Sequence, residues 1–436
     1  MNSQNLTLEQ GADFIKQESK YAPWVVCFIA SLFFFYEFIQ MNMFNAMNAQ
    51  LMQEFSLTAA MLGKLSASYF YANVLFLVPA GLILDRFSTK KIIIIALTVC
   101  VAGTFSFSLA RNIELVTLCR FLTGIGSAFC FLSCIRLASR WFPRQRMALI
   151  SGLIVTMAMV GGMIAQAPLT LLVNSTGWRA ALQFDAMLGM GIIVLIFIFV
   201  RDFPAHMRSE FDTDRQELKQ YGNWQSMKHA FLSRQNWFCG IYTSLLNLPL
   251  FLLGGLWGSL YLNSVHHLTR TDSTIVTSMI FLGTIVGSPM MGWLSDKLET
   301  RKKPMIVGAI ASSIVVALIM FSSNLTLPIL LLLFFLLGWT TSTQVISYPV
   351  VTESNQRMLT ATCVSVVSLC AISGGAIFEP LFGWLMDYHW TGTMAMGLRQ
   401  YSAHDFQFAM WLFPIGIVVA FFAALSIKET FGSTPK

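Results

Sequence analysis

The stretch Gly81-Leu-Ile-Leu-Asp85-Arg86-Phe-Ser-Thr-Lys90-Lys91 is a short charged loop between two long apolar runs. A similar loop occurs downstream as Gly292-Trp-Leu-Ser-Asp296-Lys297. The two aspartates are 211 residues apart, and Gln145-Arg146-Met147 and Gln356-Arg357-Met358 repeat at the same offset. Two matches in one register indicate an internal duplication of about half the chain.

The composition identifies a membrane protein. The 436 residues are 56% hydrophobic and only 11% charged, whereas a soluble domain carries about 25% charged residues. The apolar residues occur in runs of about 20, the length at which a helix crosses a bilayer core of about 30 Å. Transmembrane barrels alternate over about ten residues per strand, and this chain does not. The sequence therefore predicts an all-α polytopic membrane protein.

Twelve apolar runs, separated by polar or helix-breaking residues, predict twelve transmembrane helices. They lie near 22–47, 61–84, 92–110, 113–138, 147–173, 180–200, 237–263, 272–295, 304–323, 326–350, 359–387 and 406–427. The longest polar segment, 201–236, is predicted to be a cytoplasmic linker between an N-terminal half (22–200) and a C-terminal half (237–427). Segments 1–21 and 428–436 are predicted to be a cytoplasmic amino-terminal segment and a cytoplasmic tail.

The basic residues predict the orientation. The segments on the side of the two termini contain 22 of the 28 Lys and Arg residues, and the opposite side contains five. Because cytoplasmic loops are enriched in Lys and Arg, both termini are expected in the cytoplasm. The net charge of +7 follows from this distribution, so it does not indicate nucleic-acid binding. We expect an integral protein of the lipid bilayer, in a bacterial inner membrane, that acts as a monomer.

Neither a catalytic set nor a metal site is apparent in the sequence. The eight cysteines all lie in apolar runs without a C-x-x-C spacing, and the six histidines all lie outside those runs. We therefore expect no enzymatic activity, no metal and no cofactor.

Several motifs give the chain its family resemblance. The loop at 81–91 is similar to the major facilitator superfamily signature G-x-L-x-D-R-x-G-x-[KR]-[KR], with Ile83 in place of Leu and Ser88 in place of Gly. Arg120-Phe-Leu-Thr-Gly-Ile-Gly-Ser-Ala128 resembles a second signature, R-x-x-x-G-x-G-x-A. The resemblance covers all twelve predicted helices. It implies two pseudo-symmetric six-helix halves and a secondary transporter that works by alternating access around a midplane site.

Further stretches bear on the branch of the superfamily. In the predicted helix 147–173, the stretch from Gly152 to Gly162 lacks the Gly-Pro of the superfamily's drug/proton antiporters. Residues 248–262 and 374–387 resemble the bacterial intraphagosomal amino-acid transporters and the related lysosomal dipeptide carriers. These stretches favour proton symport of a small polar organic solute, an amino acid or short peptide. The alternative is a proton-antiport exporter of drugs or siderophores.

Three ionisable residues lie within apolar runs. They are Glu37, Arg120 and Glu379. Such groups are costly in a bilayer unless they are paired or face water, so each is a candidate for proton coupling. Glu37 and Arg120 belong to the same half, and their pair can either couple protons or hold two helices together. Glu379 can either bind a substrate ammonium or be protonated and hydrogen-bonded.

The resemblance extends the candidate site to helices 1, 4, 7 and 10, which line the central cavity in this superfamily. An alignment of the two halves places Gln166 opposite Glu379. The predicted substrate-binding residues are Tyr36, Gln40, Arg120, Gln166, Trp257, Tyr261, Trp339 and Glu379. Asp185 is expected near the membrane surface, close to Arg179. The resemblance also assigns a gating role to Asp85, Arg86 and Asp296.

Overall fold

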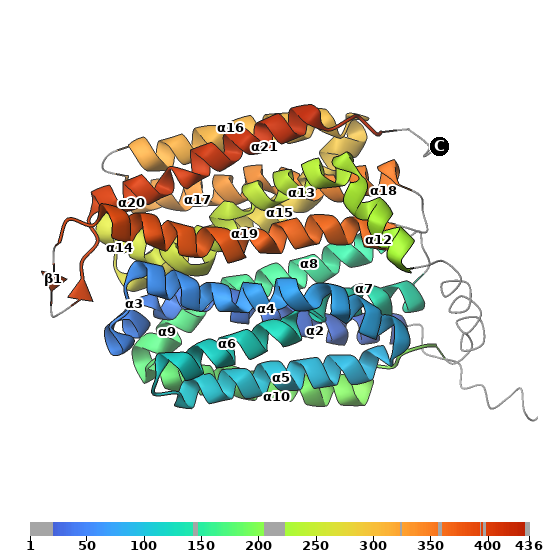
Figure 1. Cartoon of the computed structure of the whole chain (residues 1–436), viewed down its shortest axis with the longest axis horizontal. Coiled ribbons are helices and arrows are strands. Elements are labelled where there is room, and N and C mark those ends of the chain that lie inside the picture. The colour runs from blue at the N-terminus through green and yellow to red at the C-terminus, as the bar shows by residue number, and fades with distance from the viewer. Residues whose placement is uncertain are drawn as a thin grey trace, which may run out of the picture.

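The computed structural model describes residues 21–142, 147–204, 223–322, 325–355, 360–392, 394–395 and 398–431. These residues contain 12 helical spans that are long and apolar enough to cross a membrane. The spans lie roughly parallel in one bundle, with the N-terminal half below the C-terminal half in Figure 1. The predicted fold class, an all-α polytopic protein of two six-helix halves, is confirmed.

The N-terminal half contains the first six spans. Its helices are α2 (Ala22–Asn42), α3 (Phe44–Phe55), α4 (Ala59–Arg86), α5 (Thr89–Leu109), α6 (Ile113–Ser127), α7 (Cys130–Trp141), α8 (Met147–Ile164), α9 (Ala167–Thr176) and α10 (Trp178–Phe199). The first span, formed by α2 and α3, extends to Phe55. The sequence ended it too early because residues 48–55 include several polar side chains.

The C-terminal half contains the other six spans. Its helices are α12 (Asn223–Leu232), α13 (Arg234–Leu246), η3 (Leu250–Trp257), α14 (Gly258–His266), α15 (Arg270–Lys297), α16 (Lys302–Phe321), α17 (Leu327–Thr341), η4 (Ser342–Ile346), α18 (Ser347–Ser354), α19 (Thr360–His389), α20 (Ala403–Met410) and α21 (Leu412–Ser426). Two short antiparallel strands, β1 (Met394–Ala395) and β2 (Leu398–Arg399), form a hairpin between α19 and α20. We call the end of the bundle with this hairpin the hairpin face and the end where α21 finishes the termini face (Figure 1).

Helices α4 and α15 show the predicted duplication most clearly. Each has 28 residues, and both ends of α15 lie 211 positions after those of α4. Each is preceded by a threonine N-cap: Thr58 accepts a hydrogen bond from the Met61 amide, and Thr269 accepts one from the Asp272 amide. Threonine suits this position because its hydroxyl satisfies an amide that has no partner inside the helix.

All four spans that the resemblance assigns to the cavity are interrupted. The first breaks at Met43, the fourth between α6 and α7, the seventh at the π-helical segment η3, and the tenth at the 3-10 segment η4. The fifth and twelfth spans are interrupted as well. Interrupted helices leave backbone carbonyls without helical partners, and transporters use such carbonyls in binding sites.

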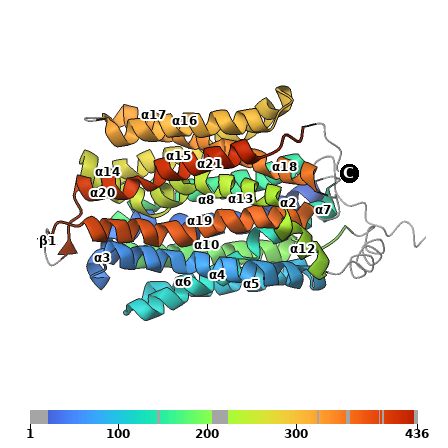
Figure 2. The same ribbon diagram turned by 45° about the horizontal axis from the view of Figure 1, so that its top comes forward.

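Close packing of α4 on α19 joins the two halves toward the hairpin face. Both views show these helices side by side (Figures 1 and 2). A methyl group on Gly63 would lie 2.6 Å from the Glu379 carbonyl oxygen, and one on Gly383 would lie 2.4 Å from the Ala59 carbonyl oxygen. Small residues at helix contacts allow such an approach, so each half contributes one glycine that this contact requires.

Hydrogen bonds add to this contact at the start of α4. Asp387 accepts from the Ala60 amide at 2.9 Å, and the Tyr401 hydroxyl accepts from the Ala59 amide at 2.8 Å. Arg399 and Tyr401 both donate to the second oxygen of Asp387. An acid at a helix N-terminus satisfies free amides and interacts favourably with the helix dipole. The hairpin face is therefore closed between the halves at this point.

Candidate functional site

Glu37 lies in α2, and its side chain is only 2% exposed. One carboxyl oxygen accepts a hydrogen bond from the Tyr69 hydroxyl at 3.1 Å. The other accepts from the Cys100 thiol at 2.8 Å. Glu37 is thus held by neutral donors from α4 and α5, which can satisfy its carboxyl in either protonation state.

Arg120 lies in α6 and is fully buried. Its guanidinium donates to the backbone carbonyls of Gln40, at 2.5 Å, and Met41, at 3.5 Å. These carbonyls belong to the last turn of α2, so the break at Met43 leaves them without helical partners. The rings of Phe44 and Tyr69 each lie 4.6 Å from the guanidinium carbon. Arg120 is therefore positioned by a helix end and two aromatic rings.

The structure corrects the expected pair of Glu37 and Arg120. Arg120 attracts Glu37 electrostatically, but their hydrogen bonds go to different partners. Among the described residues Arg120 makes no ion pair, and its Nε has no hydrogen-bond partner. The physical reason is that the carbonyls freed at the end of α2 and the Tyr69 ring already surround the guanidinium.

Asp185 joins this buried cluster, and its expected position near the membrane surface was wrong. It is 7% exposed and accepts a hydrogen bond from the side-chain amide of Gln40. The amide oxygen of Gln40 in turn accepts from Thr104 at 2.9 Å. Arg179, the expected partner of Asp185, instead pairs with Glu54. Gln40 thus connects Asp185 through its side chain and Arg120 through its backbone.

Gln166 lies at the boundary between the halves. Its amide oxygen accepts from Asn45 at 2.5 Å and from Thr277 at 2.8 Å. Its amide nitrogen donates to the Gly254 carbonyl at 2.8 Å. Two of these three partners belong to the C-terminal half, so Gln166 connects the halves through neutral hydrogen bonds.

Asn48 makes similar contacts with the seventh span. It donates to the Leu256 carbonyl at 2.8 Å and to the Ser259 hydroxyl at 2.9 Å. Ser259 also bonds to Asn45, through both its amide and its hydroxyl. Gly254 and Leu256 both lie in η3, and π-helical segments are frequent at functional sites. The π-helical turn therefore offers two carbonyls to side chains of the opposite half.

Glu379 lies in α19 and is fully buried. Neither carboxyl oxygen has a hydrogen-bond partner among the described residues. The Ser66 hydroxyl lies near this carboxyl. It too has no hydrogen-bond partner among the described residues. Arg120 attracts Glu379 electrostatically without direct contact. Arg120 therefore lies within electrostatic range of two buried acids, one from each half.

The predicted aromatic residues are distributed over a wider region. Tyr36 and Trp257 are fully buried. Neither the Tyr36 hydroxyl nor the Trp257 indole nitrogen has a hydrogen-bond partner among the described residues. The Trp257 ring stacks on the Phe382 ring, with 5.6 Å between the ring centroids. Tyr261 donates to the Ile319 carbonyl inside the C-terminal half. Trp339 is partly buried against the core of that half. Their roles in binding stay predictions.

The predicted gating residues lie near the termini face. Asp296 pairs with Arg301 at 2.5 Å, and Arg301 also pairs with Glu353 at 2.7 Å. All three belong to the C-terminal half, so these contacts stabilise one half internally. The side chains of Asp85 and Arg86 lie outside the described part of the structure. A gating role stays a prediction.

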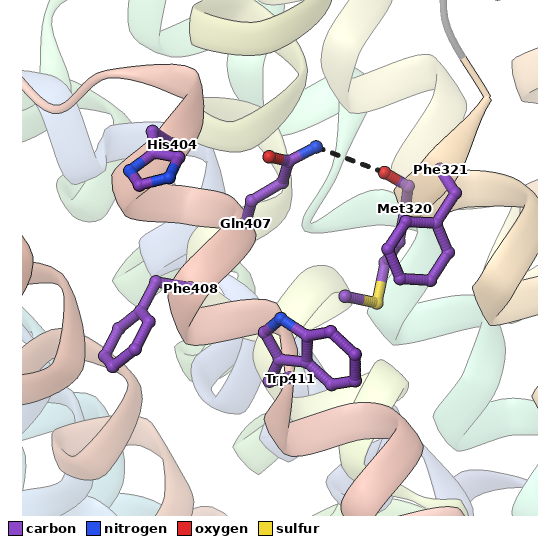
Figure 3. Close-up of a pocket in the computed structure, with 6 residues that line it drawn as sticks. All are labelled: Met320, Phe321, His404, Gln407, Phe408 and Trp411. Atoms are coloured by element: carbon purple, nitrogen blue, oxygen red, sulfur yellow. Dashed lines mark hydrogen bonds between the residues drawn. The ribbon is translucent and has the colours of Figure 1, made fainter.

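A hollow of about 210 Å³ lies away from these residues, between α16 and the start of the twelfth span (Figure 3). Met320, Phe321, His404, Gln407, Phe408 and Trp411 line it. Five of its six lining residues are apolar or aromatic, and Gln407 donates to the Met320 carbonyl. The candidate site is therefore the buried cluster around Arg120.

The comparisons with known proteins agree with this architecture. The sequence profile of the Major Facilitator Superfamily matches residues 29–269 and 241–435. The probable sulfoacetate transporter SauU of Cupriavidus necator is 24% identical over 265 residues, 57% of this chain and 59% of that protein. The uncharacterized transporter YybO of Bacillus subtilis is 24% identical over 399 residues, 86% of this chain and 88% of that protein. This chain thus aligns with less than two thirds of the length of SauU.

A solved structure shows the same fold. It is a bacterial homologue of the human lysosomal transporter Spinster, in an inward-facing and occupied conformation. Its TM-score is 0.75 at 17% identity, over 94% of this chain and 97% of that one. With the family profile matching most of the chain, the protein belongs to the Major Facilitator Superfamily and is a secondary transporter of that type.

Proposed function

We propose that the protein is a proton-coupled symporter of a small organic solute that bears a carboxylate. One observation carries this proposal: Arg120 is fully buried but makes no ion pair among the described residues. A buried cation is costly without an anionic partner, and a carboxylate matches the planar guanidinium with two parallel hydrogen bonds. A substrate carboxylate would supply the missing anion.

The buried acids support the coupling. Glu37 and Glu379 both lie within the field of Arg120. An incoming anion would weaken the attraction between Arg120 and these acids, and a carboxyl near less positive charge binds a proton more readily. Proton and substrate would therefore load together, as symport requires. With the termini in the cytoplasm, the closed hairpin face would be the outer side.

The proposed solutes, which all carry a carboxylate, are a narrower class than the solutes of the superfamily as a whole. Sulfoacetate, which the name of SauU gives as its solute, carries a carboxylate and a sulfonate. Amino acids and short peptides, the class predicted from the sequence, carry a carboxylate and an ammonium. Both kinds of solute fit Arg120, and they differ in whether a cationic group is also present.

Transport by the purified protein in liposomes tests the proposal. Alanine and lactate have the same carbon skeleton but differ in the ammonium group, and dialanine and sulfoacetate extend the series. We expect accumulation of at least one of these solutes when an inward proton gradient is imposed. Accumulation that is independent of that gradient, or accumulation of none of these four carboxylates, would overturn the proposal. Outward movement driven by proton entry would identify the antiport alternative.

A further inference from the structure

The three atoms nearest to a methyl group placed on Gly255, in the π-helical segment, are all oxygens. A methyl group on Gly255 would lie 3.5 Å from Glu379 Oε1, 3.6 Å from Asn42 Oδ1 and 3.8 Å from the Leu250 carbonyl oxygen. These oxygens come from α19, α2 and η3, so the first, seventh and eleventh spans meet here. One point between the two halves is therefore within 4 Å of a carboxyl, an amide and a backbone oxygen.

Two of these oxygens are unpaired. Asn42 and Glu379 are both fully buried, and neither Asn42 Oδ1 nor either oxygen of Glu379 has a hydrogen-bond partner among the described residues. The Asn42 amide nitrogen donates to the Phe38 carbonyl at 2.8 Å. That bond fixes the amide, so that its oxygen is directed toward Gly255.

When Glu379 is ionised, its carboxylate and the Asn42 amide oxygen are both acceptors and cannot hydrogen-bond each other. A buried acceptor without a donor costs free energy. A cation would satisfy the two unpaired oxygens at once, either as an ammonium that donates hydrogen bonds or as an alkali ion that takes oxygen ligands. The Leu250 carbonyl is the acceptor of the π-helical turn that ends at Gly255, and its second lone pair would complete the set. A methyl group on Gly255 would be in ordinary van der Waals contact with each of these oxygens, so the position suits a compact ion.

We propose that Glu379, Asn42 and the Leu250 carbonyl form a binding site for a compact monovalent cation, with Gly255 keeping the space open. This inference rests on the proposed function because it places a cation within the substrate pathway. The cation is either the ammonium group of the solute or a sodium ion. Because the ligands come from both halves, an occupied site would favour the conformation in which α2, η3 and α19 converge.

Gly255→Ala is a specific probe of this site. The added methyl would lie at ordinary van der Waals distances from all three oxygens, and alanine is a better helix former than glycine. We therefore expect the variant to fold while the methyl occupies the position of the cation. Gly191→Ala is the matched control, since a methyl there meets no atom within 4 Å.

Thermal unfolding of the purified full chain tests the proposal, because a ligand stabilises the state that it binds. Titrations with sodium chloride and with methylammonium chloride are compared with choline chloride, whose quaternary cation is larger than either and has no N–H group to donate. We expect wild type and Gly191→Ala to be stabilised by one of the small cations, and Gly255→Ala to need at least about ten times more of it. A response to sodium alone identifies an ion site, and a response to methylammonium identifies an ammonium site.

Equal responses to all three salts in wild type, or an unchanged response in Gly255→Ala, would overturn the cation site. Uptake of the carboxylate solute by the same variants separates this result from failure of the proposed function. If an Arg120 variant loses uptake while Gly255→Ala shows the wild-type salt response, the results would support the proposed function and contradict the cation site. A salt response that is lost in Gly255→Ala, without any proton-driven uptake by wild type, would support the cation site and contradict the proposed function.

Discussion

Asn48 donates a hydrogen bond to the Ser259 hydroxyl at 2.9 Å, and the two residues are 211 positions apart. This is the offset between the repeated loops and between the helices α4 and α15. Equivalent positions of two related units touch only near the axis that relates them. The Asn48–Ser259 bond therefore marks where the pseudo-twofold axis passes between the first and seventh spans.

The first prediction concerns Glu37→Gln. Glutamine keeps the size of the side chain; its amide oxygen can accept from Tyr69 or Cys100 and its amide nitrogen can donate to the other, but it cannot release a proton. We expect accumulation driven by a proton gradient to be lost, while exchange of labelled for unlabelled solute continues. Both activities are measured in the same liposomes. Glu54→Gln is the control, because Glu54 pairs with Arg179 away from the cluster; accumulation by Glu37→Gln at the wild-type level would leave Glu37 a structural role only.

The second prediction concerns Arg120→Lys. A lysine keeps the charge, but its ammonium cannot form the planar two-bond contact that a guanidinium makes with a carboxylate. We expect the half-saturating solute concentration in exchange to rise at least about tenfold, which corresponds to about 1.4 kcal/mol. Arg111→Lys, at an exposed position, should leave that concentration unchanged. An Arg120→Lys protein with normal affinity would argue against a carboxylate contact.

The third prediction concerns the contact between α4 and α19. In Gly63→Ala the new methyl would be 2.6 Å from the Glu379 carbonyl oxygen, and backbone cannot move aside as a flexible side chain can. The clash lies between the halves, so opening of the hairpin face relieves it without unfolding either half. We expect a larger distance between spin labels placed on the hairpin-face ends of α4 and α19. Gly191→Ala should reproduce the wild-type distances, and equal distances in all three proteins would contradict this account.

The fourth prediction concerns pH and the end of the described chain. Partial burial would raise the pKa of Glu429, but hydrogen bonds from the Thr300 hydroxyl and the Arg301 and Lys302 amides dominate and lower it to about 2. A pKa below the ordinary value of 4.5 means that this contact stabilises the fold above about pH 4.5 and is lost as the pH falls toward 2.

Thermal unfolding between pH 6 and 3 measures this loss. We expect the wild-type midpoint to approach that of Glu429→Gln as the pH falls, because protonation and substitution remove the same negative charge. Two midpoints that fall in parallel over this range would show that the contact does not contribute to stability.

The sequence predicted the fold because the bilayer restricts the possibilities. Apolar runs of about 20 residues leave a helix as the only structure that satisfies its own backbone, and the repeated loops locate the equivalent halves. Glu37, Arg120 and Glu379 were found for the same reason, since ionisable groups inside a span are conspicuous. The predicted offset is present in the ends of α4 and α15.

The partners of these residues depend on details that periodicity does not give. The break at Met43, which provides carbonyls to Arg120, has no proline or glycine beside it. Asp185 lies seven residues into its helix, and only its contact with Gln40 reveals that it faces the interior. The stripe Asn42, Asn45 and Asn48, at intervals of three residues, is a further sequence signal for the contact between the halves. It is the spacing of one helix face.

The cysteines of this protein determine how its motions can be observed. All eight are free thiols; seven are buried and Cys370 is partly buried. A thiol-specific fluorophore or spin label would therefore react first with a cysteine introduced on the surface, so the native chain can itself serve as the labelling background. Removing every native cysteine would be the poorer route, because Cys100 donates to Glu37, and a thiol-free protein would lack this buried hydrogen bond.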